Sequence, residues 1–107
     1  MSCMVKICGI NSEDALIAAM SAGADALGYV FFPPSPRHIS LKGAKTLTER
    51  VPNSILKVGL FVEAGDEALE NAITAGSLDV IQLHGKESPE RVAAVKERFG
   101  LKVMKAI

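Results

Sequence analysis

Short apolar runs alternate with stretches of helical spacing along the whole chain, and this alternation most limits what it can fold into. The apolar runs, each typical of a β-strand, are Met4–Cys8, Ala26–Phe31, Ile55–Val62, Asp79–Leu83 and Lys102–Ile107. Between them, apolar residues recur every three or four positions, as on the buried face of an amphipathic helix. The order β-α-β-α-β-α-β-α-β predicts an α/β fold with a parallel sheet and right-handed crossovers.

Residues typical of helix ends support the same division. Serines stand where helix N-caps are expected, at Ser12, Ser40 and Ser88. Glycines stand where C-terminal caps are expected, at Gly23, Gly76 and Gly100, and Pro52 is expected to stop the second helix. The run Val58–Val62 is apolar throughout, which predicts a strand covered on both faces.

Composition narrows the class of protein. A chain of 107 residues has room for one domain, residues 1–107, and 49% hydrophobic content is enough for a core. Twelve basic residues balance twelve acidic ones, so we expect no nucleic-acid partner and no membrane-surface binding. Two cysteines, Cys3 and Cys8, make neither a disulfide framework nor a zinc pattern. The longest apolar run, Leu27–Phe32, is too short to span a bilayer, and we expect a cytoplasmic protein.

The strand count leaves two architectures open. Five strands and four helices could form a complete flavodoxin-like, doubly wound domain, or the first half of an eight-stranded (β/α)8 barrel. Both folds place their sites at the carboxyl ends of the parallel strands. Polar residues in those positions are therefore the candidates for function.

Cys8 and Lys6 share one face at the end of the first strand. A lone small thiol is more often a core residue than a reactive one. A strand end before a helix start, however, offers backbone N–H groups and a positive dipole that favour the thiolate form, and Lys6 adds positive charge. The alternative interpretation of Lys6 is a solvated lysine at a strand end.

Arg37 and the pair Gln82 and His84 follow two other strands. Three prolines stiffen the loop from residue 32 to residue 38, which would hold Arg37 over the strand ends, where a guanidinium suits a carboxylate or a phosphate. An exposed loop arginine is the simpler interpretation, and His38 is expected at the surface. Gln82 and His84 are in phase at a strand end, although a lone histidine is usually structural. No metal-ligand cluster, Ser-His-Asp set or phosphate-binding glycine motif occurs.

Four segments together resemble one enzyme family in order and spacing. They are Lys6–Ile10, Ser35–Arg37, Val58–Val62 and Ile81–Gly85. The sequence resembles phosphoribosylanthranilate isomerase of tryptophan biosynthesis over its full length, and Gly23–Asp25 and Val103–Ile107 fit the same pattern. That family is a single-domain (β/α)8 barrel, and such barrels need roughly 200 residues or more. The resemblance therefore covers the first half, through the fifth strand.

The resemblance implies a reaction and a set of roles. The reaction is the Amadori rearrangement of N-(5′-phosphoribosyl)anthranilate to 1-(2-carboxyphenylamino)-1-deoxyribulose 5-phosphate, with no cofactor and no metal. It implies that Cys8 is the general base, acting as a thiolate, and that Arg37 grips the anthranilate carboxylate. It implies that Gln82 and His84 line the substrate site. The family's general acid, an aspartate, and its phosphate site would lie beyond Ile107.

Two other functions remain open from the sequence. The chain could be a non-catalytic half-barrel or a flavodoxin-like binding or assembly module. It could also be a different sugar-phosphate enzyme on the same fold, because a fold does not fix a function. As a half-barrel it would have open strand edges and an uncovered inner face, so we expect it to need a missing C-terminal half or to associate with itself.

Overall fold

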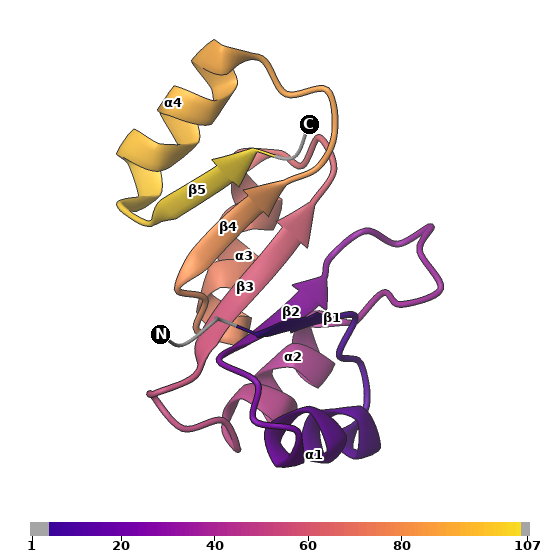
Figure 1. The fold of residues 1–107 in the computed structure, drawn as a ribbon. Helices are drawn as coiled ribbons and strands as arrows, with labels where there is room; N and C mark the ends of the chain where they lie inside the picture. Colours follow the sequence, from indigo (N-terminus) through magenta and orange to yellow (C-terminus); the bar gives the residue numbers. More distant parts are fainter. Residues whose placement is uncertain (1–4, 106–107) are drawn as a thin grey trace.

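The computed structural model describes residues 5–105 and confirms the predicted order of elements (Figure 1). The elements are β1 (Lys6–Cys8), α1 (Glu13–Ser21), β2 (Ala26–Val30), α2 (Leu41–Thr48), β3 (Leu56–Phe61), α3 (Asp66–Gly76), β4 (Val80–Leu83), α4 (Pro89–Phe99) and β5 (Lys102–Lys105). Cys3 and the outer ends of the first and last predicted strands lie outside the described residues.

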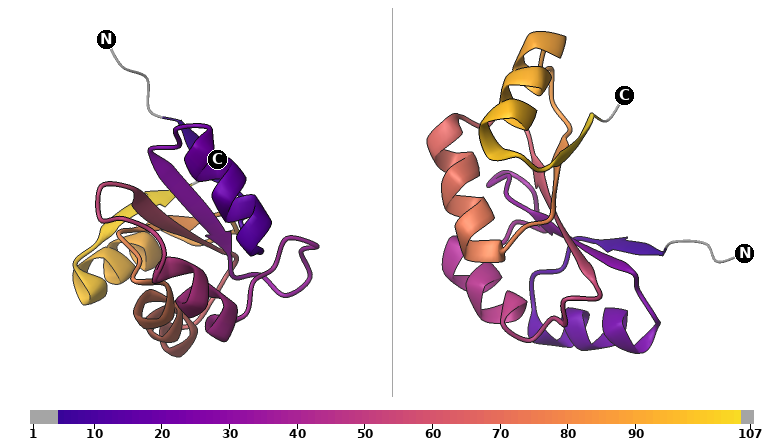
Figure 2. Two further views of the ribbon diagram at one scale, coloured as in Figure 1. Left: turned by 90° about the horizontal axis from the view of Figure 1, so that it is seen from below. Right: turned by 90° about the vertical axis from the view of Figure 1, so that its left-hand side faces the viewer.

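The five strands within residues 5–105 are parallel and lie side by side in chain order, β1-β2-β3-β4-β5. A flavodoxin-like sheet reverses its strand order at one point, which places helices on both faces. An unreversed order with right-handed crossovers places every helix on the same face. The four helices do lie on one side of a curved sheet (Figure 2). The structure therefore corresponds to half of a (β/α)8 barrel, and the doubly wound alternative is wrong.

The serine caps predicted from the sequence are confirmed. The side chains of Ser12, Ser40 and Ser88 each accept a hydrogen bond from the backbone N–H three residues later, at 3.0–3.1 Å. These bonds satisfy N–H groups that have no partner within the helix. Gly100 ends α4 with a left-handed φ of 64°, as predicted.

Two predicted helix ends differ from the structure. Gly76 is the last residue of α3, and Ser77 takes the left-handed conformation instead, with φ 49°. Gly76 packs closely against Leu78, because a Cβ there would stand 2.9 Å from a methyl carbon of that side chain. Helix α2 ends at Thr48, before Pro52, so a turn rather than the proline stops it.

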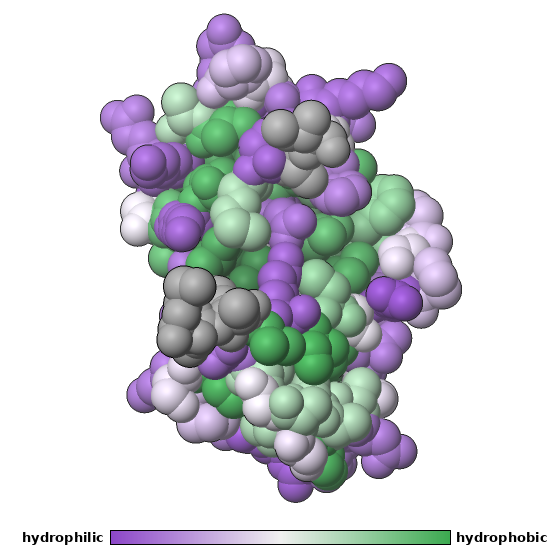
Figure 3. Space-filling model, viewed as in Figure 1, coloured by the Kyte–Doolittle hydropathy of each residue, from purple (hydrophilic) through white to green (hydrophobic). Residues whose placement is uncertain are grey.

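The main core lies between the sheet and the helix layer. Its largest fully buried side chains are Tyr29, Phe61, Leu16, Leu27, Leu69, Ile81, Leu83 and Val95. The opposite, concave face carries a smaller buried cluster of Ala26, Val58 and Val80. Apolar side chains gather over the strands on this face, which no helix covers (Figure 3). Most of β3 is buried, as predicted, with Phe61 1% exposed on the helix side and Val58 3% exposed on the concave side.

A charged pair interrupts the apolar pattern at the start of β3. Lys57 is 5% exposed on the helix side of the sheet, and its Nζ lies 3.4 Å from Oδ2 of Asp79. The backbone N–H of Lys57 also donates to Asp79 Oδ2 at 2.8 Å, and Asp79 N–H donates to the Lys57 carbonyl at 2.8 Å. A buried ammonium needs such a partner, and the pair joins β3 to the entrance of β4.

The register of β1 is fixed at its first residues. Val5 N–H donates to the Asp25 carboxylate at 2.8 Å, and the Val5 carbonyl accepts from Asp25 N–H at 2.8 Å and Ala26 N–H at 3.2 Å. Lys6 then pairs with Ala26, and Cys8 pairs with Gly28. Because side chains alternate along a strand, Lys6 and Cys8 share the concave face.

Candidate functional site

Cys8 is the last residue of β1, and its free thiol is exposed. The neighbouring strand leaves room for it through a glycine, because a Cβ at Gly28 would stand 2.8 Å from Cys8 Sγ. The interpretation of Cys8 as a core thiol is therefore wrong. An exposed thiol at the carboxyl edge of a barrel strand is placed where such folds carry out chemistry.

The expected helix N-terminus is not next to Cys8. Helix α1 begins at Glu13, and the N–H groups of Gly9 and Ile10 both donate to the Gly28 carbonyl at 3.0 Å. The amides that follow Cys8 are therefore used to close the turn after β1. The reason is local: Gly9 has a φ of 83°, which turns the chain back toward β2 before the helix starts.

Lys6 is neither solvated nor free beside the thiol. Its Nζ donates a hydrogen bond to Oε1 of Gln82, although β2 and β3 lie between their strands. The lysine side chain must cross the concave face to reach β4, and the curvature of the half-barrel makes this possible. Gln82 is half-buried, and its amide oxygen binds Lys6, a contact that the sequence did not predict.

Arg37 lies close to the end of β1. Its loop is ordered by a hydrogen bond from Arg37 N–H to Ser35 Oγ at 3.1 Å and one from His38 N–H to the Ser35 carbonyl at 3.1 Å. The exposed Arg37 side chain and Cys8 both line a hollow of about 410 Å³ beside α1. The loop thus brings an arginine from β2 and a thiol from β1 to one opening.

His84 follows β4 and is exposed. Its N–H donates to the Phe61 carbonyl at 2.8 Å, which fixes its backbone to the end of β3. The structure thus groups the predicted residues in two pairs, Cys8 with Arg37 and Lys6 with Gln82. His84 stands at the same edge of the sheet, at the end of β4.

Sequence reasoning missed Glu87, whose carboxylate lies at this edge with only 3% of its side chain exposed. It accepts hydrogen bonds from Glu63 N–H at 2.7 Å and Gly85 N–H at 2.9 Å, and Lys105 Nζ lies 3.3 Å away. Burial opposes its ionisation, but these bonds and its own N–H outweigh burial and hold its pKa below the usual value. A glutamate in a polar loop gives no sequence signal for this role.

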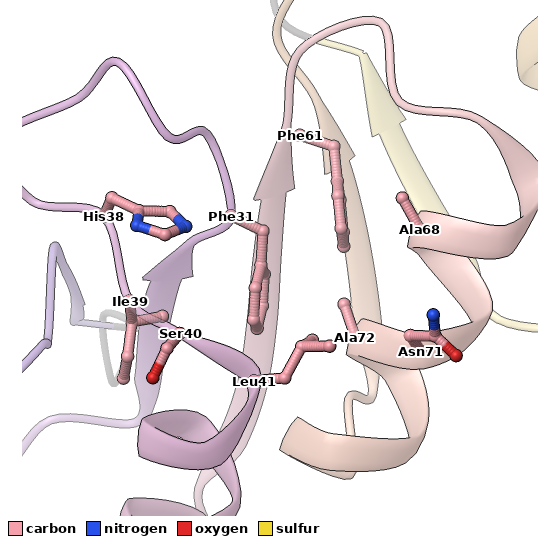
Figure 4. Close-up of a pocket in the computed structure, with 9 residues that line it drawn as sticks. All are labelled: Phe31, His38, Ile39, Ser40, Leu41, Phe61, Ala68, Asn71 and Ala72. Carbon is pink, nitrogen blue, oxygen red and sulfur yellow. The ribbon is translucent and has the colours of Figure 1, made fainter.

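A second hollow lies on the helix side, away from Cys8, Gln82 and His84. It has a volume of about 340 Å³ between α2 and α3, and the aromatic rings of Phe31 and Phe61 stack beside it with centroids 5.3 Å apart (Figure 4). His38, which was expected at the surface, lines this hollow and is half-buried. The hollow brings together none of the predicted site residues.

Within residues 5–105, no three side chains of the metal-binding types His, Cys, Asp and Glu come together as a possible metal site. None of the helices described is long and apolar enough to cross a membrane.

Fold and site together define a β/α-barrel half-domain with its candidate site at the carboxyl ends of the strands. Residues 5–107 match the family model of N-(5′-phosphoribosyl)anthranilate (PRA) isomerase. The N-(5′-phosphoribosyl)anthranilate isomerase of Rhodopseudomonas palustris (strain HaA2) is 51% identical over 107 residues, which are 100% of this chain and 49% of the relative. The chain belongs to the N-(5′-phosphoribosyl)anthranilate isomerase family.

Solved structures agree with this assignment. The phosphoribosyl anthranilate isomerase of Thermotoga maritima matches 99% of this chain and 51% of its own, with a TM-score of 0.91 and 35% identity. A phosphoribosyl anthranilate isomerase in complex with reduced 1-(o-carboxyphenylamino)-1-deoxyribulose 5-phosphate matches 99% of this chain and 54% of its own, with a TM-score of 0.91 and 35% identity. The chain spans about half the length of the curated relatives it matches.

Proposed function

We propose that this chain supplies the first half of a barrel that converts N-(5′-phosphoribosyl)anthranilate to 1-(2-carboxyphenylamino)-1-deoxyribulose 5-phosphate, a step of tryptophan biosynthesis. Family membership supports the reaction, and a related solved structure holds a reduced form of the product. The reaction is an isomerisation, so it needs a proton donor and a proton acceptor but no redox partner.

The steps balance within the substrate. An acid protonates the ring oxygen, the C1′–O bond breaks, and the nitrogen lone pair forms a C1′=N bond. A base then takes the C2′ proton, and the electron pair of the C2′–H bond forms C1′=C2′ while the C=N electrons return to nitrogen. The resulting enol loses its hydroxyl proton and gains a proton at C1′, which gives the ketone.

In this proposal Cys8 is the base and Arg37 binds the anthranilate carboxylate. The observation that supports both roles is that Arg37 packs against Gly9, the residue that directly follows the exposed Cys8, and that Cys8 and Arg37 line one hollow beside α1. A thiolate takes protons at carbon, and a planar guanidinium matches a carboxylate with two parallel hydrogen bonds. Gln82 and His84 complete this part of the site, with Gln82 also holding Lys6.

Residues 1–107 then form half of one domain, and the general acid and the phosphate site belong to the other half. The concave face, which none of the described helices covers, and the terminal strands β1 and β5 support the need for a complement. Without one, we expect the chain to associate with itself, which sedimentation would detect; a monomer with a cooperative melt would contradict this.

A cytoplasmic location fits the biosynthetic family and the free Cys8 thiol.

The test uses a completed barrel, in which residues 1–107 are joined to the C-terminal half of the Rhodopseudomonas palustris (HaA2) relative. Product formation is followed by steady-state kinetics. Cys8→Ala is expected to lower kcat by at least about a hundredfold, because general-base catalysis contributes roughly 10²–10⁴-fold. Cys3→Ala, which removes the other thiol, is the matched control. Full turnover by Cys8→Ala would remove Cys8 from the reaction.

A further inference from the structure

We propose that Glu87 is a positioning residue of this site, which acts by holding the loop that carries His84 at the carboxyl edge of the sheet. The proposal rests on the function proposed above. It concerns a residue outside the motifs Lys6–Ile10, Ser35–Arg37 and Ile81–Gly85 by which the sequence resembles its family.

The carboxylate of Glu87 joins three segments at the site edge. Oε2 accepts from Glu63 N–H, in the loop after β3, at 2.7 Å. Oε1 accepts from Gly85 N–H, in the loop after β4, at 2.9 Å, and lies 3.3 Å from Nζ of Lys105 on β5. Lys105 Nζ also donates to the Gly85 carbonyl. One side chain thus connects the carboxyl ends of β3, β4 and β5.

Both loops are shaped around this carboxylate. Glu63 has a left-handed φ of 50°, which a non-glycine residue adopts only when its surroundings hold it there. A Cβ at Gly85 would stand 2.9 Å from Glu63 Cγ and 3.1 Å from Glu87 Oε2. The carboxylate thus lies between the N–H groups of two loops that approach each other closely.

His84 is fixed by bonds on both sides of its α-carbon. Its own N–H donates to the Phe61 carbonyl at 2.8 Å, and the next N–H, that of Gly85, donates to Glu87. Loss of the second bond leaves the segment after His84 held only through the Gly85 carbonyl, which accepts from Lys105 Nζ. An active-site side chain displaced by about 1 Å can lose roughly a hundredfold in rate.

Glu87 acts through His84 rather than on the substrate. Its side chain is 3% exposed, and both carboxylate oxygens are already used by donors from the chain. A ligand would have to displace the Glu63 and Gly85 amides to reach it. The histidine beside it, in contrast, is exposed.

The test is a double-mutant cycle in the completed barrel. Glu87→Gln keeps the size of the side chain but turns an NH₂ group toward one of the N–H donors. We expect kcat/KM to fall roughly ten- to a hundredfold. In a His84→Ala background the same substitution should cost less than about threefold, because the group it positions is gone. Equal losses in both backgrounds would overturn the proposal.

A spectroscopic readout tests the positioning directly. The His84 ring signals in the NMR spectrum should shift on Glu87→Gln, together with the amide signals of Glu63 and Gly85. The control is Glu90→Gln, an exposed glutamate in the first turn of α4, which should move none of them. Unmoved His84 signals would contradict the proposal whatever the activity.

The two proposals fail in different ways. If Cys8→Ala retains full turnover, or the unsubstituted barrel does not convert the substrate, the proposed function fails while the NMR result on His84 stands.

If Glu87→Gln does not fold, Glu87→Asp replaces it. The shorter side chain can bond only one of the two amides, and we expect an intermediate loss.

Discussion

The side chain of Arg37 lies against the α-carbon of Gly9, so closely that a Cβ added at Gly9 would stand 2.5 Å from Arg37 Cδ. Gly9 directly follows Cys8, so this contact sets the separation between the guanidinium-bearing loop and the proposed base. The absence of a side chain at Gly9 thus determines where the Arg37 side chain can lie.

The proposed binding of the anthranilate carboxylate by Arg37 predicts how the loss of this side chain affects the kinetics. Arg37→Ala in the completed barrel should raise KM by roughly ten- to a hundredfold with a smaller change in kcat, because a hydrogen bond to a charged group contributes about 1.5–3 kcal/mol. Steady-state kinetics measures both constants. An unchanged KM would exclude Arg37 from substrate binding.

Gly9→Ala provides a matched test of the same contact, since it displaces Arg37 without removing it. Gly23→Ala is the control: its φ of 81° is close to the 83° of Gly9, but nothing lies within 4 Å of its added Cβ. Both variants should lose about 1–2 kcal/mol of stability through backbone strain. Only Gly9→Ala should raise KM, and a similar KM in the two variants would mean that the Arg37 contact is unimportant.

A second prediction concerns the room around the thiol. A Cβ at Gly28 would stand 2.8 Å from Cys8 Sγ and 3.2 Å from Cys8 Cα, so Gly28→Ala must push the thiol or β1 aside. We expect kcat to fall at least about tenfold. Gly65→Ala, where nothing lies within 4 Å, should retain turnover. Retained turnover in Gly28→Ala would show that the thiol position is not critical.

The buried Lys57–Asp79 pair predicts an asymmetry in stability. Asp79→Ala leaves a buried ammonium without its partner and should cost about 2–3 kcal/mol. This is below the roughly 3–5 kcal/mol typical of fully buried pairs, because the Asp79 side chain is 41% exposed. Lys57→Met removes the buried charge itself and should cost less. Urea unfolding measures both; equal losses would refute the asymmetry.

The depressed pKa of Glu87 predicts a pH dependence of stability. A carboxyl group whose pKa is lower in the folded state stabilises that state above its ordinary pKa of 4.5, and this contribution is lost as the pH falls through the lower folded value. The free energy of unfolding should therefore drop below about pH 4.5, and Glu87→Gln should reduce that slope. Identical slopes would indicate that other carboxyl groups dominate.

The order of helices and strands was predicted from the sequence better than the contacts between distant residues were. Period and capping signals are local, so Ser12, Ser40 and Ser88 identified three helix starts correctly. Strand order is not local, and alternation alone fits a barrel half as well as a doubly wound sheet. The family motifs favoured the barrel, and the unreversed strand order establishes it.

Contacts between distant residues had no local signal. Lys6 meets Gln82 only because the sheet curves, and Glu87 meets Glu63 and Lys105 only because three strands end at one edge. The burial of Lys57 also has no local signal, and the position of Asp79 explains it. Positions along the strands were therefore predictable, whereas partners were not.

The Asp25 carboxylate that bonds Val5 N–H has a further consequence for how this gene can vary. Only three residues, Lys6–Cys8, form β1, and neighbouring side chains point to opposite faces. Deleting Lys6 or Ile7 would turn the thiol toward the helix layer, at the position that Ile7 now holds, and would place Gly9 at the position of Cys8. A loop far from the site can change in length without changing the chemistry, but this strand cannot lose or gain a single codon.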